Sequence, residues 1–206
     1  MDLLTQMRDD LVSGDILLSV ALRKARVLAE SLNDEDFTKW VKFEMNGYPP
    51  ESTDVPGYRV LNVPSIGHFV GAFGREARNI NLPSFNLSKA VQEFMRKTIL
   101  YEGVAGLEAL ISSESNSIVI KWPANIVVMC QDKFYVGMSL IDANKQIGRS
   151  MVVQILESIR NRLLEFVLSL RKKYPEYKTE EALQQIPKEE IQQEFKAHIS
   201  GSYAVN

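Results

Sequence analysis

The stretch Ser150–Lys173, SMVVQILESIRNRLLEFVLSLRKK, decides the fold because it is the strongest helical pattern in the chain. Its apolar residues recur every three or four positions and form one seam, made of Val152, Leu156, Ile159, Leu163, Phe166 and Leu170. The seam is too short to indicate a coiled coil, and an exposed seam of this length would promote aggregation. Val153, Leu164 and Leu168 widen the apolar arc. We therefore expect a central helix, covered by the rest of the chain, whose remaining surface joins a homodimer.

The N-terminal side of the chain supplies the elements that can cover this helix. Helical spacing of apolar residues predicts helices over Met1–Leu11 and from Asp15 to about Leu32. A third helix is expected to start at the N-cap Asn33 and to stop at Gly47, before two prolines. The predicted core therefore contains several helices that pack on the long one.

The middle of the chain changes to a strand-like pattern. Alternating residues predict strands over Tyr58–Val63 and His68–Phe73, which could pair as a hairpin, and further strands over Ser117–Trp122 and Phe134–Ile141. The sequence over Leu87–Ser112 returns to a helical pattern, which Gly103 and Gly106 are expected to kink or break, and Asn125–Cys130 fits a strand or a short helix. The sequence thus predicts an α+β fold with N-terminal helices, a small and mainly antiparallel sheet, and a long C-terminal helix in the core.

After the long helix the chain becomes polar and rich in Glu, Gln and Lys. Thr179 and Pro187 are typical helix starts, and Ile191, Phe195 and Ile199 lie four apart, so they can form a narrow docking stripe. We therefore expect residues 1–173 to form the domain and residues 174–206 to form a partly helical appendage.

Composition excludes several classes of protein. The chain has 206 residues, of which 45% are hydrophobic, and its net charge is −2, so it is neither disordered nor generally basic like many nucleic-acid binders. A single cysteine forbids an internal disulfide and favours a reducing compartment. The sequence contains no apolar run of the roughly 18 residues that span a membrane. We expect a cytoplasmic protein without a clear nucleic-acid partner.

Metal and thiol chemistry find little support. His68 and His198 have no neighbouring ligand at metal-binding spacing, so we expect no metal and no cofactor. Cys130 follows four apolar residues, which favours a buried and inert thiol over a nucleophile.

A glycine-rich segment precedes two arginines. Gly67, Gly71 and Gly74 lead to Arg75 and Arg78, an arrangement that could cradle an anion such as phosphate. The spacing matches neither a P-loop nor a dinucleotide fingerprint, and glycines in strands more often mark bulges. We favour a structural role for this segment, and we keep Arg75 and Arg78 as candidates for anion binding.

The end of the third helix and the start of the next strand form a predicted corner. Glu44 shares a helix face with Trp40, so its carboxylate needs a partner if that face is buried. A contact from Glu44 to Arg59 or to Tyr58 would lock this corner. We predict a structural role for Trp40, Glu44, Tyr48 and Arg59.

The long helix also carries charged residues off its seam. Glu157, Arg160, Arg162 and Glu165 are expected to face solvent, and the alternative is a polar interface with a partner. In a symmetric dimer these charges could pair across the two-fold axis.

Several segments together resemble the AbiTii domain family. They are Leu22–Ala29, Trp40–Pro49, Pro56–Arg59, Ile120–Pro123 and Ile155–Phe166. The resemblance covers about residues 1–173, and the order of elements agrees throughout. It implies a role in bacterial abortive infection, in which an infected cell stops phage production by arresting itself.

The resemblance does not supply a reaction or catalytic residues, so the type of activity stays open. The first hypothesis is a non-enzymatic sensor or interaction module that recognises a phage or host protein, or holds a cognate effector inactive. The alternative is a nuclease or nucleotide-targeting toxin with a site near Gly67–Arg78. A third hypothesis is a membrane-directed effector, which would need a spanning segment that this sequence does not contain.

Overall fold

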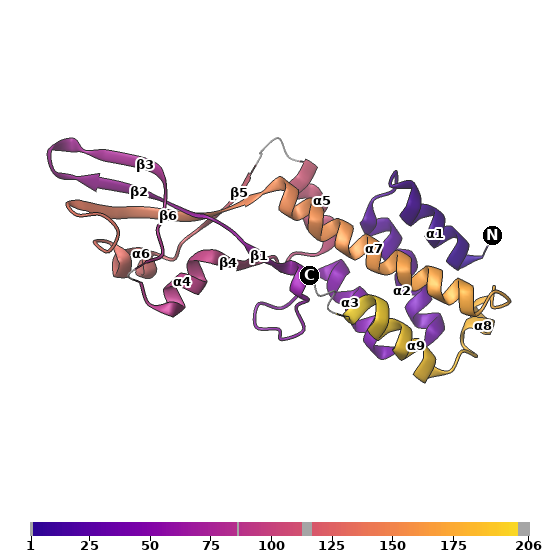
Figure 1. Cartoon of the computed structure of the whole chain (residues 1–206). Helices are drawn as coiled ribbons and strands as arrows, with labels where there is room; N and C mark the ends of the chain where they lie inside the picture. Colours follow the sequence, from indigo (N-terminus) through magenta and orange to yellow (C-terminus); the bar gives the residue numbers. More distant parts are fainter. Residues whose placement is uncertain (1, 86, 113–116, 202–206) are drawn as a thin grey trace. The chain divides into compact units, whose positions relative to one another are not determined.

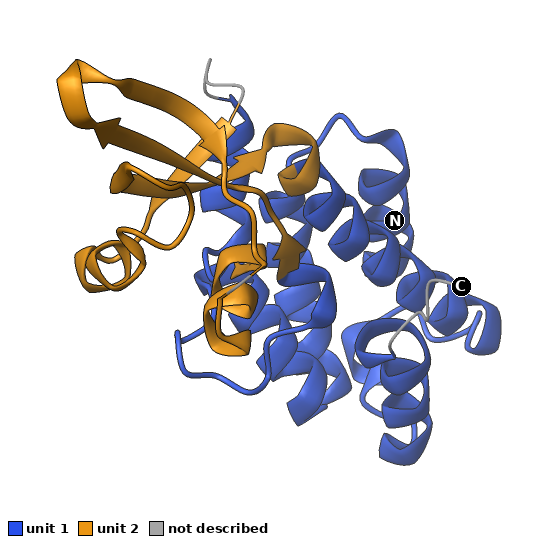
Figure 2. Ribbon diagram, turned by 60° about the vertical axis from the view of Figure 1, so that its left-hand side comes forward, with its two compact units in different colours: residues 1–59, 101–112, 153–206 blue, residues 60–100, 113–152 orange. Residues whose placement is uncertain are grey.

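The computed structural model describes residues 2–85, 87–112 and 117–201. It divides into two compact units, coloured in Figure 2: unit 1 consists of residues 1–59, 101–112 and 153–206, and unit 2 of residues 60–100 and 113–152. The chain therefore passes from one unit to the other four times. Helices combine with small antiparallel sheets, so the predicted α+β class is confirmed.

Unit 1 is helical (Figure 1). Its elements are α1 (Leu3–Ser13), α2 (Leu18–Leu32), α3 (Glu35–Asn46), the 3-10 turn η1 (Gly57–Arg59), α5 (Val104–Ser112), α7 (Arg149–Lys173, in this unit from residue 153), α8 (Glu180–Leu183), α9 (Lys188–Phe195) and the π-helical turn η3 (Lys196–Ser200).

The long helix α7 packs against the N-terminal helices, as predicted. All residues of the predicted seam are buried, and the ring of Phe166 lies 4.7 Å from that of Phe37 in α3, measured between centroids. Val153 and Leu168 stay 39% and 38% exposed, so the chain itself covers the seam and leaves only a narrow apolar strip.

The boundary between α2 and α3 differs from the prediction by one residue. Asn33 ends α2 in the left-handed conformation, with φ of 50°, and the N-cap of α3 is Asp34. The Asp34 carboxylate accepts a hydrogen bond of 2.8 Å from the backbone N–H of Phe37. Asparagine tolerates the left-handed region better than most residues, which explains why it closes one helix instead of opening the next.

The polar C-terminal segment belongs to unit 1. Thr179 caps α8 and Pro187 precedes α9, as predicted. The predicted stripe, Ile191, Phe195 and Ile199, is buried. The units are defined by packing alone, so a domain boundary at residue 173 stays a prediction.

Unit 2 contains the sheets. Its elements are β1 (Val60–Asn62), β2 (Ser65–Gly71), the turn η2 (Ala72–Gly74), β3 (Glu76–Asn81), α4 (Lys89–Arg96), β4 (Lys97–Ile99), β5 (Ser117–Lys121), α6 (Ala124–Cys130) and β6 (Met138–Gly148). A four-stranded antiparallel sheet has the order β3-β2-β6-β5, and β1 pairs separately with β4.

Two expectations for the middle of the chain are wrong. The first two strands do not pair with each other, because only Val63 and Pro64 separate them and neither adopts the left-handed conformation that a two-residue hairpin needs. The helical pattern over Leu87–Ser112 is divided into α4, β4 and α5. Two β-branched residues, Thr98 and Ile99, favour the intervening strand.

Other predicted elements are present in the structure but begin or end at different residues. The strand expected over Phe134–Ile141 starts at Met138 and continues to Gly148, and the ambiguous segment Asn125–Cys130 is the helix α6. No helix within the described part of the chain is long and apolar enough to cross a membrane.

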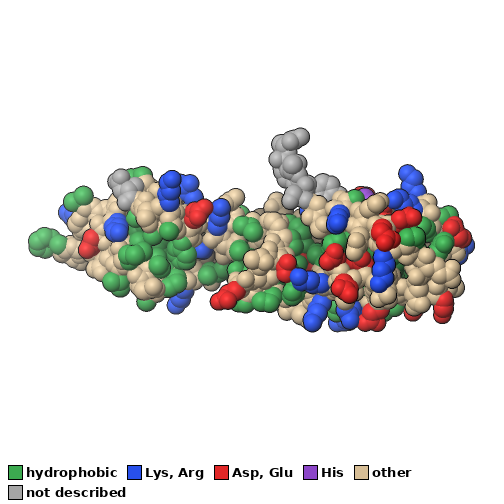
Figure 3. All heavy atoms as spheres, turned by 90° about the horizontal axis from the view of Figure 1, so that it is seen from below, with side chains coloured by type: hydrophobic (Ala, Val, Ile, Leu, Met, Phe, Trp, Pro, Cys, Tyr) green, Lys and Arg blue, Asp and Glu red, His purple; other side chains and the backbone are tan. Residues whose placement is uncertain are grey.

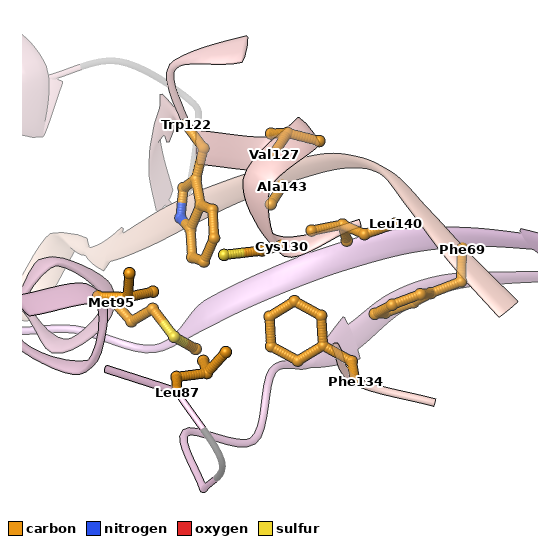
Figure 4. Close-up of a cluster of buried hydrophobic side chains, with 10 residues drawn as sticks. Phe69, Leu87, Met95, Trp122, Val127, Cys130, Phe134, Leu140 and Ala143 are labelled. Carbon is orange, nitrogen blue, oxygen red and sulfur yellow. The ribbon is translucent and has the colours of Figure 1, made fainter. Parts of the chain in front are cut away.

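The core of unit 2 lies between the sheet and its helices (Figure 4). Phe69, Leu140 and Ala143 of the sheet pack with Leu87, Val91, Met95, Trp122, Val127, Cys130 and Phe134. The indole N–H of Trp122 donates to the Ser65 hydroxyl at 3.3 Å, so the buried polar atom of this cluster has a partner.

Candidate functional site

A pocket of about 830 Å³ opens in unit 1 beside α3 and α7. It is lined by Asp36, Lys39, Trp40, Phe43, Tyr48, Asp54, Pro56, Gly57, Tyr58, Ser158, Asn161, Arg162, Glu165, Phe195, Ile199, Ser200 and Gly201. This volume is in the range of small-molecule and cofactor sites. Aromatic rings make up much of the wall, and charged groups stand at the rim.

A buried carboxylate organises the wall of this pocket. Glu44 accepts hydrogen bonds from the hydroxyls of Tyr48 at 2.7 Å and Tyr58 at 2.6 Å. The Arg59 guanidinium donates to the other oxygen of Glu44 at 2.5 Å, and both side chains of this ion pair are fully buried. The indole N–H of Trp40 donates to the Tyr58 hydroxyl at 3.0 Å. Both contacts considered for Glu44 from the sequence are therefore present in one network.

Electrostatics fix the protonation states of this network. Burial and the nearby charge of Glu44 raise the pKa of Tyr48 and of Tyr58 well above the usual value for a phenol. Burial alone would lower the pKa of Arg59, but the charge and hydrogen bonds of Glu44 outweigh it and raise that pKa. The two phenols therefore stay protonated as hydrogen-bond donors and Arg59 stays a cation, so these three side chains form a fixed support around the Glu44 carboxylate.

A tight crossing of two segments supports the same corner. Arg59 also donates to the carbonyl of Glu102 at 2.8 Å, and the backbone N–H of Tyr48 donates to the carbonyl of Tyr101 at 2.8 Å. A Cβ at Gly103 would lie 2.3 Å from the carbonyl oxygen of Met45, so only glycine permits this approach.

Arg162 links the pocket to the end of α9 and η3. Its guanidinium lies 5.0 Å from the centroid of the Tyr58 ring, and it donates to the carbonyls of Ile199 at 2.6 Å and Gly201 at 2.8 Å. Glu165 is exposed one turn further along α7, on the same rim. Of the helix charges expected at an interface, these two share one pocket.

Arg160 points to different surroundings, although it is only two residues from Arg162. Its guanidinium lies 3.3 Å from the carbonyl oxygen of Ile16 and 3.6 Å from the carboxylate of Glu157. Arg160 does not line the pocket that Arg162 and Glu165 share, and an interface that includes all of these charges stays a prediction.

The glycine-rich segment of unit 2 does not form a comparable site. Arg78 pairs with Glu76 at 2.6 Å, and His68 contacts the same oxygen at 2.6 Å. The hydrogen bonds from Arg78 and then from His68 hold the pKa of Glu76 below its usual value. Arg75 is exposed in the adjoining turn. The two anion-binding candidates therefore lie on the surface of the hairpin instead of around a cradle.

The remaining reactive side chains are dispersed. Cys130 is buried in the core of unit 2, and this burial raises the pKa of its thiol. His198 contacts Glu194 at 3.3 Å in unit 1. Within the described ranges, no three or more His, Cys, Asp and Glu residues gather as a metal would require.

Sequence reasoning missed part of the pocket. Lys39 and Asp54 form an ion pair of 2.9 Å at the rim, and Ile199 to Gly201 close one side. Loop and chain-end residues carry no periodic pattern that would place them there. Tyr58 could be predicted from the sequence, because a buried Glu44 carboxylate requires a hydrogen-bond donor nearby.

Comparisons with known proteins give one match. The family described as AbiTii matches residues 2–195 of the chain. No curated protein and no solved structure matches it.

Proposed function

This chain belongs to the AbiTii family, and we propose that it serves abortive infection as a non-enzymatic sensor or interaction module whose pocket in unit 1 binds a partner. Family membership implies the antiphage role itself. The proposal concerns how that role is performed and where the partner binds.

The observation that carries the proposal is the state of the polar groups behind the pocket wall. Both oxygens of Glu44 accept hydrogen bonds, and Arg162 is held by two backbone carbonyls and an aromatic ring. These groups stabilise the wall and are not available to move protons or attack a substrate. What the pocket offers is a rigid aromatic surface with a charged rim, which suits recognition.

We propose that the bound partner is a segment of a phage or host protein, or of a cognate effector. Aromatic side chains are favoured at protein interfaces because their large, rigid rings bury much apolar area, and here the network with Glu44 holds the rings of Trp40, Tyr48 and Tyr58 in place. The rim adds charges of both signs, from Lys39, Asp36 and Glu165. Such a mixed rim fixes the orientation of a peptide more than its affinity.

A bulky substitution inside the pocket tests this proposal. Asn161 is an exposed lining residue of α7, so Asn161→Trp should fill the pocket without disturbing the core. Gln154→Trp places the same side chain at an exposed position of α7 that does not line the pocket, and it is the matched control.

The readout is the efficiency of plating of a phage panel on cells that express each variant at equal levels. We expect Asn161→Trp to lose protection and Gln154→Trp to retain it. Affinity capture from infected cells should recover a partner with the wild type and the control only. A folded Asn161→Trp protein that protects fully would rule out this pocket as the recognition site.

A separate measurement addresses the enzymatic alternative. The purified protein is incubated with nucleic acids and nucleotides, and the double variant Arg75→Ala/Arg78→Ala is the comparison. Turnover by the wild type that disappears in the double variant would replace the sensor with a nuclease or nucleotide-targeting toxin. We expect no turnover by either protein.

A further inference from the structure

Two fully exposed apolar side chains lie at one end of unit 2. Phe73 is in the turn between β2 and β3, and Val136 is in the turn that precedes β6; their relative exposures are 102% and 106%. We call these two residues the tip. Single exposed apolar residues are common, but two with no cover at neighbouring turns form a projection and not a groove.

The pairing of β2 with β6 places both turns together. Gly71 is the register partner of Met138, so Phe73 and Val136 each lie two residues beyond the same pair. A Cβ added at Gly71 would lie only 2.7 Å from the carbonyl oxygen of Gly137. Hydrophobic side chains are visible at this end of unit 2 in Figure 3, on the left, where Figure 1 shows the β2–β3 turn.

The fold gains nothing from the Phe73 side chain. Its φ is 56°, in the left-handed region that is unfavourable for a residue with a Cβ. Its ring is fully exposed, so no burial offsets this cost. A glycine would satisfy the turn better, which indicates that the side chain serves a contact outside the chain.

Charge identifies the kind of surface that this tip would meet. Unit 2 carries nine Lys and Arg residues against five Asp and Glu, a net charge of +4, whereas unit 1 carries 15 against 21, a net charge of −6. Arg75 and Lys133 are exposed beside the two turns. The neighbouring carboxylates are engaged, since Glu76 pairs with Arg78 and Asp132 accepts from the Ser139 hydroxyl at 2.7 Å.

We propose that the tip docks unit 2 onto an anionic lipid bilayer, with Phe73 and Val136 entering the interfacial layer and Arg75 and Lys133 contacting lipid headgroups. A fluid bilayer accepts a small apolar projection anywhere on its surface, whereas a protein partner would need a matching cavity. Basic residues near an anionic surface each strengthen such binding. This docking requires no spanning helix and is independent of the pocket in unit 1.

Vesicle co-sedimentation of the full chain tests the proposal. One set of vesicles contains phosphatidylcholine alone, and the other contains equal parts of phosphatidylcholine and phosphatidylglycerol. We expect binding to the anionic vesicles only, with a loss of about tenfold or more in Phe73→Gly/Val136→Ser because two apolar anchors are removed. Arg75→Gln/Lys133→Gln should lose about fivefold for each charge removed.

Val12→Ser/Leu17→Ser is the matched control, because it removes two exposed apolar side chains from unit 1 and should bind like the wild type. A Phe73→Trp variant should show a blue-shifted emission with anionic vesicles, against the constant signal of the two buried tryptophans. Equal binding to both kinds of vesicle, or binding that survives the loss of both tip residues, would overturn the proposal. Absence of binding to either vesicle would overturn it as well.

Discussion

The ion pair of Glu44 and Arg59 matters most for the stability of unit 1. Both side chains are fully buried, so removal of one partner leaves an uncompensated charge on the other. We predict that Arg59→Met lowers the free energy of unfolding by about 3–5 kcal/mol. Urea denaturation measures this change. Arg26→Met is the control, since it breaks an exposed pair with Glu30 and should cost no more than about 0.5 kcal/mol. A small effect of Arg59→Met would show that water reaches Glu44.

A second residue-scale prediction concerns pH. Burial alone would raise the pKa of Glu194, but hydrogen bonds from Lys173 and Ser169 outweigh it and hold that pKa below its usual value of about 4.5. A carboxylate whose pKa is lowered by folding stabilises the folded state above its unfolded pKa, and this contribution disappears as the pH falls through the folded pKa.

Thermal unfolding from pH 7 down to pH 3 should therefore show a loss of stability below about pH 4.5 that Glu194→Gln reduces. Glu189→Gln, which removes an exposed carboxylate of the same helix, should leave the profile unchanged. Because Lys173 is 46% exposed, added salt should weaken the effect. Identical profiles for the wild type and Glu194→Gln would contradict this assignment.

The sequence identified the residues of the corner better than the residues of the pocket. Glu44 on an apolar helix face demanded a partner, and the short list of donors nearby contained Tyr58 and Arg59. The pocket depends on where Ile199 to Gly201 lie, and only the three-dimensional path of the chain decides that. A sequence pattern can reveal a buried charge, because the unfavourable burial has to be offset by partners that here lie nearby in the sequence. It does not reveal a cavity between segments that are distant in the sequence.

Among the structural elements, α5 offers a direct test of how closely its start approaches α3. Gly103 precedes α5 with no room for a Cβ, whereas a Cβ at Gly106 inside α5 would meet only the Cβ of Glu102 at 3.5 Å. Gly103→Ala should therefore destabilise the protein by about 1–3 kcal/mol through overpacking. Gly106→Ala should stabilise it by about 0.5–1 kcal/mol through helix propensity. Chemical denaturation measures the free energy of unfolding of both variants. Equal changes in the two variants would refute the close approach at Gly103.

Helices were predictable and strand pairing was not. Periodic apolar residues located α2, α3 and α7 because this pattern repeats with every helix turn. The partner of β1 is β4, and a strand of three residues carries no signal for a partner so far along the chain. The predicted hairpin failed because neighbouring strands in the sequence were assumed to pair, and Val63 and Pro64 leave no turn between them.

For the molecule as a whole, a homodimer stays a prediction, and less apolar surface is left to drive it than the sequence indicated. Intramolecular packing buries the seam of α7, so the apolar side chains of that helix left for a second copy are Val153 and Leu168, with half-buried Met151 and Leu164. We therefore predict a weak dimer that forms only at high protein concentration. Light scattering over a concentration series measures it, and Leu168→Glu should abolish it. A constant monomer mass at all concentrations would end this prediction.

Because the chain passes between the units four times, the two units are completed in a fixed order during translation. Every residue of unit 2 lies between residues 60 and 152, so all its strands leave the ribosome before most of α7 does. At 5–20 residues per second, roughly 5–20 seconds separate the synthesis of α3 from that of the helices that cover it. In that interval Phe37 lacks the rings of both Phe166 and Phe195. Helix α3 is thus made early and covered late, and the nascent chain exposes this helix to aggregation and chaperone binding until α7 and α9 have been made.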